Sequence, residues 1–246
     1  MDNSFFAGRY SDPLFDTLPA WPLSDGEIHF LYWFIQGSIT IPETRRALRR
    51  GWGFCERHAW AALAVELCYR PKFLHGPALL YRELLQRCLA AIPERGPLRG
   101  QRLARRWCSQ GRCRMCELNT YRAGRGGGLP SVIDRGRQTG PLYRFAVAHK
   151  DHWNSTVCGL CRGDNSPMRC RRHLIAQPGG TADDEIARHA AMLGEMLDRM
   201  RMLARSYEWG HHGTDRPQDR GALISAVGFM SGWRPLLALL DAHATT

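Results

Sequence analysis

Residues 158–173 read CGLCRGDNSPMRCRRH and contain a Cys-x-x-Cys pair, Cys158 with Cys161, followed by a Cys-x-x-His pair, Cys170 with His173. Each pair places two soft ligands on one tight turn or first helical turn, where both side chains can reach the same ion. The residues between the pairs include glycine, aspartate, asparagine, serine and proline, which favour a chain reversal. Because zinc prefers a tetrahedral shell of thiolates and imidazoles, we predict a structural Zn²⁺ site here.

Two further pairs lie upstream, Cys55 with His58 and Cys113 with Cys116. In chain order the four pairs form the first to the fourth half-site, and together they fit two Cys3His sites with nothing left over. By elimination, the first and second half-sites would form another structural zinc site, which staples the N-terminal half to the middle of the chain. Three cysteines remain, two on apolar helical faces and one close enough to the second half-site to substitute as a ligand: Cys68, Cys88 and Cys108.

The third half-site, Cys158-Gly159-Leu160-Cys161, also resembles the redox dithiol of thioredoxin-type proteins. Such a dithiol should follow a strand and open a helix within a β-rich fold. Here a turn-rich loop follows instead, and a Cys-x-x-His pair lies just beyond it. The context therefore favours metal binding over disulfide exchange.

The hydrophobic pattern predicts an all-α fold. Apolar residues recur three and four positions apart, which is the period of a helix lying on a core, and no segment shows a convincing strand pattern. Thr181 and Asp184 are typical of a capped start of the longest helix. The predicted helices cover residues 25–36, 42–50, 56–69, 76–92, 141–152, 183–207, 222–229 and 235–243.

The helices are expected to form two halves stapled by the Cys/His zinc sites. Residues 1–94 would form the N-terminal helical half and residues 141–246 the zinc-binding and C-terminal helical half. Residues 95–140, rich in glycine and arginine, would be a basic connector that carries the second half-site. The 246 residues, 44% of them hydrophobic, suffice for an ordinary buried core in one large domain or two small ones.

No apolar stretch approaches the roughly 20 residues needed to cross a bilayer, so no membrane partner is expected. The N-terminal residues 1–6 lack the basic start and apolar core of a secretory signal. We therefore expect a cytoplasmic protein, in which disulfides are disfavoured. The sequence leaves the oligomeric state open.

The chain has a formal net charge of +11, and Lys72 and Lys150 are its only lysines. This charge would suit the backbone of DNA or RNA, although the excess of arginine over lysine can also reflect a GC-rich coding genome. Few aromatic residues lie among the arginines, so backbone contact is expected rather than base reading. Zinc would order the arginines that flank the proposed ligands, and these are the candidate phosphate contacts: Arg102, Arg105, Arg106, Arg112, Arg114, Arg162, Arg169, Arg171 and Arg172.

Two other functions stay open. A metal-dependent enzyme or accessory protein of bacterial metabolism could use an open metal site. Its ligands would come from polar segments that hold His149, His152, His211 and His212, although such histidines are usually solvated. A protein-protein adapter with purely structural zinc is the second alternative. Nucleotide-binding glycine loops and serine nucleophile elbows are absent from the sequence.

Residues 53–60, GFCERHAW, resemble the signature of an uncharacterised bacterial family built from two helical modules. In that family each module opens with Cys-Pro-x-Cys and later carries Gly-Phe/Leu-Cys-x-x-His at the start of a helix. The second half-site resembles the opening pair of the second module, with Arg114 in place of proline. A long helix, a polar loop and a final helix near Trp233 are also similar. The resemblance implies helices and metal but transfers no activity.

This chain departs from the family at residues 21–24, WPLS, where the first module's cysteine pair is expected. The first half-site has therefore lost its usual partners. It could be an empty remnant, or it could borrow the second or third half-site. Module order would instead couple the second half-site with the fourth, so the pairing stays open at this point.

Overall fold

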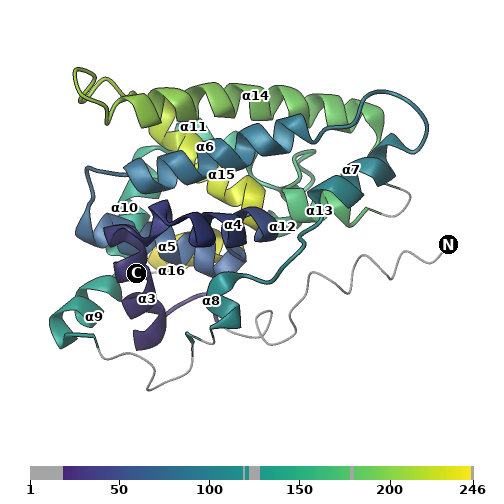
Figure 1. Ribbon diagram of the computed structural model, residues 1–246. Coiled ribbons are helices and arrows are strands. Elements are labelled where there is room, and N and C mark those ends of the chain that lie inside the picture. Colours follow the sequence, from purple (N-terminus) through teal and green to yellow (C-terminus); the bar gives the residue numbers. More distant parts are fainter. Residues whose placement is uncertain (1–18, 119, 122–127, 178–179, 245–246) are drawn as a thin grey trace.

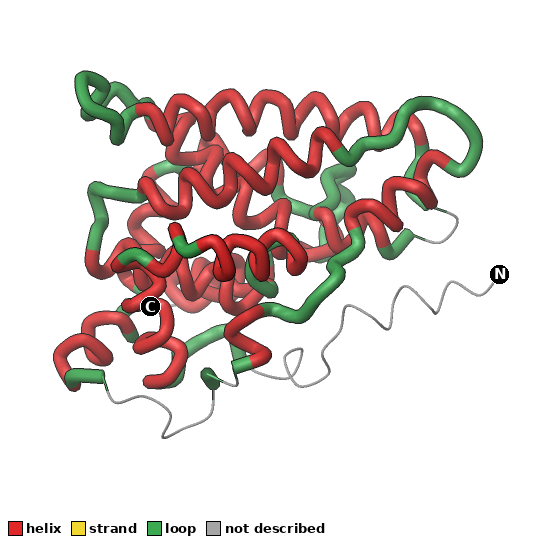
Figure 2. The backbone as a smooth tube through the Cα atoms, in the orientation of Figure 1, coloured by secondary structure: helices red, strands yellow, loops and turns green. Residues whose placement is uncertain are grey.

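The computed structural model describes residues 19–118, 120–121, 128–177 and 180–244, and all regular structure within these ranges is helical (Figures 1 and 2), which confirms the predicted all-α class. In chain order the elements are α3 (Asp25–Gln36), η1 (Ser38–Thr40), α4 (Pro42–Gly51), α5 (Glu56–Tyr69), α6 (His75–Ala90), α7 (Arg99–Trp107), α8 (Arg114–Glu117), α9 (Pro130–Gly136), α10 (Gly140–Ala148), α11 (Lys150–Trp153), η2 (Asn154–Thr156), α12 (Gly159–Arg162), α13 (Arg171–Ile175), α14 (Asp183–Arg205), α15 (Pro217–Ser231) and α16 (Arg234–Ala244).

Several helix ends differ by one or two residues from the predicted ones, and larger differences occur at α15, in the segment 141–152 and at the cap of α14. Helix α15 begins at Pro217, five residues early, because the carboxylate of Asp219 accepts a hydrogen bond from the Arg216 backbone N–H at 2.9 Å and so caps the helix. The segment 141–152 forms two helices, α10 and α11, rather than one. The predicted cap of α14 is wrong, because the hydroxyl of Thr181 donates to the Leu174 carbonyl at 2.9 Å instead.

Helices α5 and α15 form the centre of the fold, and nearly every residue of α15 is buried. Helix α14 packs along both α6 and α15, and α3, α9, α10 and α16 contact α5 (Figure 1). A row of tryptophans joins these layers, with ring centroids 6.0 Å apart for Trp60 and Trp233 and 5.7 Å apart for Trp153 and Trp233. The buried cluster includes side chains from both predicted halves and from the connector.

The predicted connector, residues 95–140, contains α7, α8 and α9. Helix α7 buries Leu103 and Trp107 and packs against α13, and its exposed arginines are Arg105 and Arg106. Within the described ranges, each helix is too short or too polar to cross a lipid bilayer.

A substitution at Gly228 tests the packing of α15. A Cβ atom there would lie 2.2 Å from the ring of the buried Trp233, whereas one at Gly194 of α14 would meet nothing within 4 Å. Overpacking predicts that Gly228→Ala lowers the free energy of unfolding by about 1 to 3 kcal/mol. Gly194→Ala, the matched control, should raise it by up to about 1 kcal/mol, since alanine favours a helix interior. Denaturant unfolding measures both, and a neutral Gly228→Ala would contradict the packing.

Candidate metal centres

The four half-sites share one local geometry. In each, the first cysteine is the N-cap of a helix and the second ligand is the third helical residue: Cys55 and His58 on α5, Cys113 and Cys116 on α8, Cys158 and Cys161 on α12, and Cys170 and His173 on α13. Side chains at these two positions lie on the same side of the first turn. The partial positive charge of a helix N-terminus also favours thiolate over thiol. Each half-site is therefore a preformed bidentate ligand.

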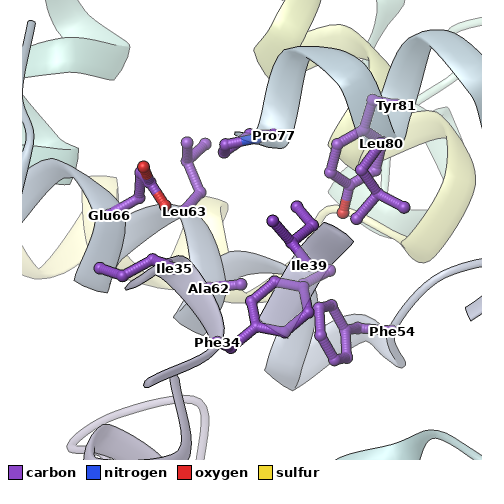
Figure 3. A pocket seen from close by; sticks show the side chains of 11 residues that line it. Phe34, Ile35, Ile39, Phe54, Ala62, Leu63, Glu66, Pro77, Leu80 and Tyr81 are labelled. Carbon is purple, nitrogen blue, oxygen red and sulfur yellow. The ribbon is translucent and has the colours of Figure 1, made fainter. Parts of the chain in front are cut away.

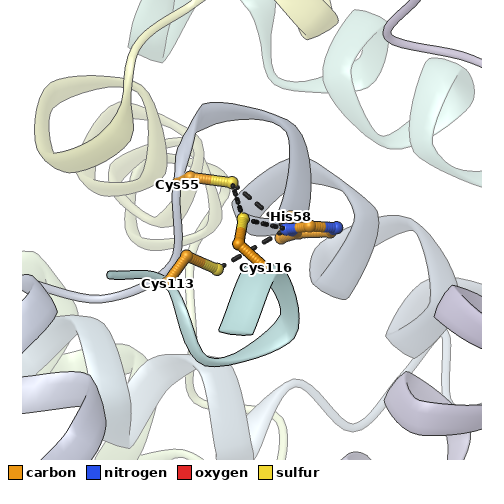
Figure 4. A group of neighbouring side chains, drawn as sticks. All are labelled: Cys55, His58, Cys113 and Cys116. Carbon is orange, nitrogen blue, oxygen red and sulfur yellow. Dashed lines mark hydrogen bonds between the residues drawn. The ribbon is translucent and has the colours of Figure 1, made fainter. Parts of the chain in front are cut away.

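The first and second half-sites meet in a group that we call site 1 (Cys55, His58, Cys113 and Cys116), whose ligand atoms all lie within 4.8 Å of one another (Figure 4). His58 Nδ1 lies 3.1, 3.5 and 3.4 Å from the sulfurs of Cys55, Cys113 and Cys116. The Cys55 and Cys116 sulfurs are 3.7 Å apart. This pairing is the one expected by elimination, and the module-order alternative, which joins the second half-site to the fourth, is wrong.

The third and fourth half-sites form site 2 (Cys158, Cys161, Cys170 and His173), whose ligand atoms also lie within 4.8 Å of one another. His173 Nδ1 lies 3.1, 3.5 and 3.3 Å from the sulfurs of Cys158, Cys161 and Cys170. The Cys161 and Cys170 sulfurs are 3.9 Å apart. Cys161 and His173 are half-buried, so site 2 is more open to solvent than site 1, where only Cys55 is half-buried.

The sulfur–sulfur distances match the edges of a zinc-centred tetrahedron, and the sulfur–nitrogen distances of 3.1 to 3.5 Å equal its edge or fall a few tenths of an ångström short of it. Bonds of about 2.3 Å to sulfur and about 2.0 Å to nitrogen give edges of about 3.8 Å between sulfurs and about 3.5 Å between sulfur and nitrogen. The sulfur–sulfur distances of 3.7 and 3.9 Å are far from a disulfide bond of about 2.05 Å. All nine cysteines are free thiols. Each group could therefore hold one metal ion.

In each site, the surroundings of one cysteine favour loss of its thiol proton. Burial opposes ionisation of Cys113, but hydrogen bonds from Cys116 and Cys55 and the charge of His58 outweigh it, so the pKa of Cys113 lies well below its ordinary value. In site 2, hydrogen bonds from Cys161 and Cys170 lower the pKa of Cys158. A thiolate is the form that binds a metal, and in each group one cysteine favours that form.

A buried carboxylate orients the histidine of site 1. His58 Nε2 donates to Glu27 Oε1 at 2.9 Å, which leaves Nδ1 facing the three sulfurs. Glu27 also accepts from Arg57 at 2.7 and 2.8 Å and from the Ser24 backbone N–H at 2.7 Å. Burial raises the pKa of Glu27, but the hydrogen bonds from Arg57 and His58 outweigh it and hold the pKa far below its ordinary value. Such a carboxylate fixes the tautomer of a metal-binding histidine.

The two sites are joined by an ion pair between their half-sites. Glu56 lies between Cys55 and His58, and Arg172 lies between Cys170 and His173. The Arg172 guanidinium donates to the Glu56 carboxylate at 3.0 Å, and the Arg234 guanidinium donates to the same carboxylate at 2.7 Å. Site 1 on α5, site 2 on α13 and the start of α16 are thereby held together.

Most of the predicted phosphate-contact arginines are exposed or half-buried, but Arg171 is not on the surface. It is 4% exposed, and its guanidinium donates to the Met230 carbonyl at 3.1 Å and to the Trp107 carbonyl at 2.5 Å. Its charge stabilises two helix C-terminal carbonyls within the core. The assignment of Arg171 as a phosphate contact is therefore wrong. Arg169 donates to the Ser166 and Met168 carbonyls within the site 2 loop.

The histidines considered for an open metal site do not join a metal-binding group. Among the described residues, the groups of three or more potential ligands are sites 1 and 2, and neither includes His149, His152, His211 or His212. His149 Nδ1 lies 2.7 Å from the Phe145 carbonyl, and His211 Nε2 lies 3.1 Å from the Arg205 guanidinium. Cys68 and Cys88 are buried in helices, as predicted. Cys108 lies outside both groups.

An apolar pocket between α3, α5 and α6 contains one carboxylic acid, Glu66 (Figure 3). Glu66 is 3% exposed, and burial raises its pKa to about 8, against the opposing charge of Arg70. The folded protein therefore keeps a proton that the unfolded chain, with an ordinary pKa of 4.5, releases. Stability due to this group is present below pH 4.5 and is lost as the pH rises through 8.

Glu66→Gln should remove this pH dependence. At pH 9 with zinc in excess, we expect the variant to have a larger free energy of unfolding than the parent. The difference between variant and parent should be about 4 kcal/mol more favourable to the variant at pH 9 than at pH 5. Glu195→Gln, an exposed site on α14, is the matched control and should leave the pH profile of the parent unchanged. Denaturant unfolding at both pH values measures the effect. Parallel profiles for parent and Glu66→Gln would contradict it.

Comparison with known proteins finds no matching family model, no matching curated protein and no matching solved structure.

Proposed function

We propose that this chain is a zinc-stabilised helical binding protein in which sites 1 and 2 each hold one structural Zn²⁺ ion. The observation that supports this most is the set of distances among four ligand atoms in each group, which fit a zinc tetrahedron. Three thiolates and one imidazole form a closed, soft shell that leaves no position for substrate. A closed shell is typical of structural rather than catalytic zinc.

The placement of the sites supports a structural role. Site 1 joins α5 to α8, whose ligands Cys55 and Cys116 are 61 positions apart in the sequence. Site 2 closes the turn between α12 and α13, and the buried Arg171 of α13 then reaches α7 and α15. Short helices such as α8, α12 and α13 are not stable alone, so metal would supply the missing stabilisation.

The binding part of the proposal is contact with the phosphate backbone of a nucleic acid. Its support is the net charge of +11 and the exposed arginines that the second half-site and α7 present: Arg105, Arg106, Arg112 and Arg114. The planar guanidinium group of arginine can donate two parallel hydrogen bonds to phosphate oxygens, and its positive charge complements theirs.

Metal analysis of the native protein tests the zinc part of the proposal. We expect two zinc ions per chain by native mass spectrometry of protein purified without added metal. Denatured mass spectrometry of the same sample should give the mass of nine free thiols. A protein that keeps its helicity with no zinc, or that holds other metals in preference when zinc is supplied, would contradict it.

A further inference from the structure

Arginines of α4 and α6 interleave on one surface of the molecule. Arg45 and Arg49, one turn apart on α4, both pair with Glu83 of α6. Arg87 of α6 reaches back to the Arg49 carbonyl, and its guanidinium lies 4.1 Å from the ring centre of Trp52. These contacts therefore hold the arginines of the two helices on one shared surface.

The segment before site 1 extends this surface. The Gln110 backbone N–H donates to the Arg50 carbonyl at 2.9 Å, and the Ser109 hydroxyl donates to the Gly51 carbonyl at 3.1 Å. These bonds hold residues 109–112 against the end of α4, and the exposed Arg112 directly precedes the ligand Cys113. Formation of site 1 therefore fixes the position of Arg112 in the fold.

We propose that this surface binds the phosphodiester backbone of a nucleic acid. We call it the basic face, and it consists of Arg45, Arg49, Arg50, Arg82, Arg87 and Arg112. The inference rests on the phosphate-contact part of the proposed function and deepens it, since it locates that contact mainly on α4 and α6, with Arg112, rather than on α7.

The charge balance of the basic face supports a polyanionic partner. Glu83 pairs with both Arg45 and Arg49, so the arginines that α4 and α6 contribute to the face outnumber this carboxylate and leave an excess of positive charge on these two helices. Burial and then the charges of Arg49 and Arg82 lower the pKa of Arg45, and burial followed by Arg49 lowers the pKa of Arg87. Like charges held this close repel one another, and a row of phosphates would relieve that repulsion while releasing counterions.

The side chains around the basic face favour a nucleic-acid backbone over a lipid surface. A helix that lies on a membrane inserts large apolar side chains beside its basic ones. Along α4, α6 and residues 108–112 no large apolar side chain is exposed, and the nearest ones in the chain are Ile41, just before α4, and Phe73, two residues before α6. Trp52, under Arg87, is 1% exposed and cannot stack on a base. We therefore expect the basic face to contact the sugar-phosphate backbone of a nucleic acid without stacking on its bases.

Titrations with a 20-base-pair DNA duplex and an RNA duplex of matched sequence, at several salt concentrations, test the inference. The test variant is Arg49→Gln/Arg50→Gln/Arg82→Gln, in which glutamine keeps the helix propensity and removes three charges. We expect its affinity to fall about tenfold or more at low salt, and the slope of log K against log salt to become shallower by about 2 to 3. Comparing the two duplexes shows whether DNA or RNA is preferred.

The matched control is Arg137→Gln/Arg144→Gln/Arg201→Gln, which removes the same charge from three exposed arginines at the end of α9, on α10 and on α14. It should bind both duplexes like the parent. Equal weakening by both triples, no binding of either duplex at 50 mM salt, or tighter binding to phosphatidylserine vesicles than to the duplexes would overturn the inference. Zinc content and helicity of every variant are measured in parallel, so that loss of the zinc sites is distinguished from loss of the basic face.

Discussion

Cys116→Ser is expected to remove one zinc ion per chain and to lower the melting temperature by about 10 °C or more. Serine cannot supply the thiolate, so site 1 loses a ligand, and structural zinc in small sites contributes apparent binding energies of about 10 to 16 kcal/mol to folding. Loss of even a part of that energy, about 5 kcal/mol, corresponds to a shift of about 10 to 20 °C for a chain of this length. Native mass spectrometry and thermal unfolding followed by circular dichroism measure both effects.

Cys161→Ser should likewise remove one ion, from site 2, but with a smaller loss of stability. The ligands of site 2 close a loop of 15 positions, whereas those of site 1 close a loop of 61 positions. Closing the longer loop removes more chain entropy from the unfolded state, which corresponds to about 1 kcal/mol of additional stabilisation. Cys108→Ser changes a half-buried cysteine outside both sites and should keep two ions. Unchanged zinc content in Cys116→Ser or in Cys161→Ser would show that the substituted cysteine is not a ligand. Loss of one ion in Cys108→Ser would contradict the assignment of Cys108 to a position outside both sites.

Glu27→Gln is expected to lower the zinc affinity of site 1 about 10- to 100-fold, because the outer partner of a metal-binding histidine sets its orientation and basicity. The same change leaves the Arg57 guanidinium, whose side chain is 9% exposed, without its buried countercharge. Breaking such a pair costs about 3 to 5 kcal/mol, so stability should fall by a similar amount. Chelator competition measures the affinity, and denaturant unfolding measures the stability.

The control for Glu27→Gln is Asp25→Asn on the same helix. Asp25 is exposed and pairs with Arg137 at 2.5 Å, so its loss should cost less than about 1 kcal/mol and leave both zinc affinities unchanged. In Glu27→Gln, site 2 should keep the affinity of the parent, because the ligand to which Glu27 hydrogen-bonds is His58 of site 1. An equal loss of affinity at both sites would point to general destabilisation rather than to orientation of His58.

Some of the site 1 network could be found in the sequence, and some could not. Ser24-x-x-Glu27 is a capping-box pattern, and both of its hydrogen bonds form at the start of α3. The pattern says nothing of His58, which is 31 positions away. Arg171 shows the opposite failure, since its setting among basic residues indicates a surface position, whereas the carbonyls of Trp107 and Met230 hold it in the core. Contacts between distant segments leave no periodic signal.

The sequence alone determined the helical class, most helix positions and the four half-sites, because each depends on residues within one or two helical turns. An N-cap ligand and a ligand three residues later face the same way in any helix, so Cys-x-x-Cys and Cys-x-x-His can be recognised wherever they occur. Tertiary packing alone decided which half-sites meet, which carboxylate orients His58, and that α4 and α6 combine their arginines. These outcomes depend on how α3, α5, α8 and α13 pack together, and that packing is set by the whole buried core rather than by any local pattern.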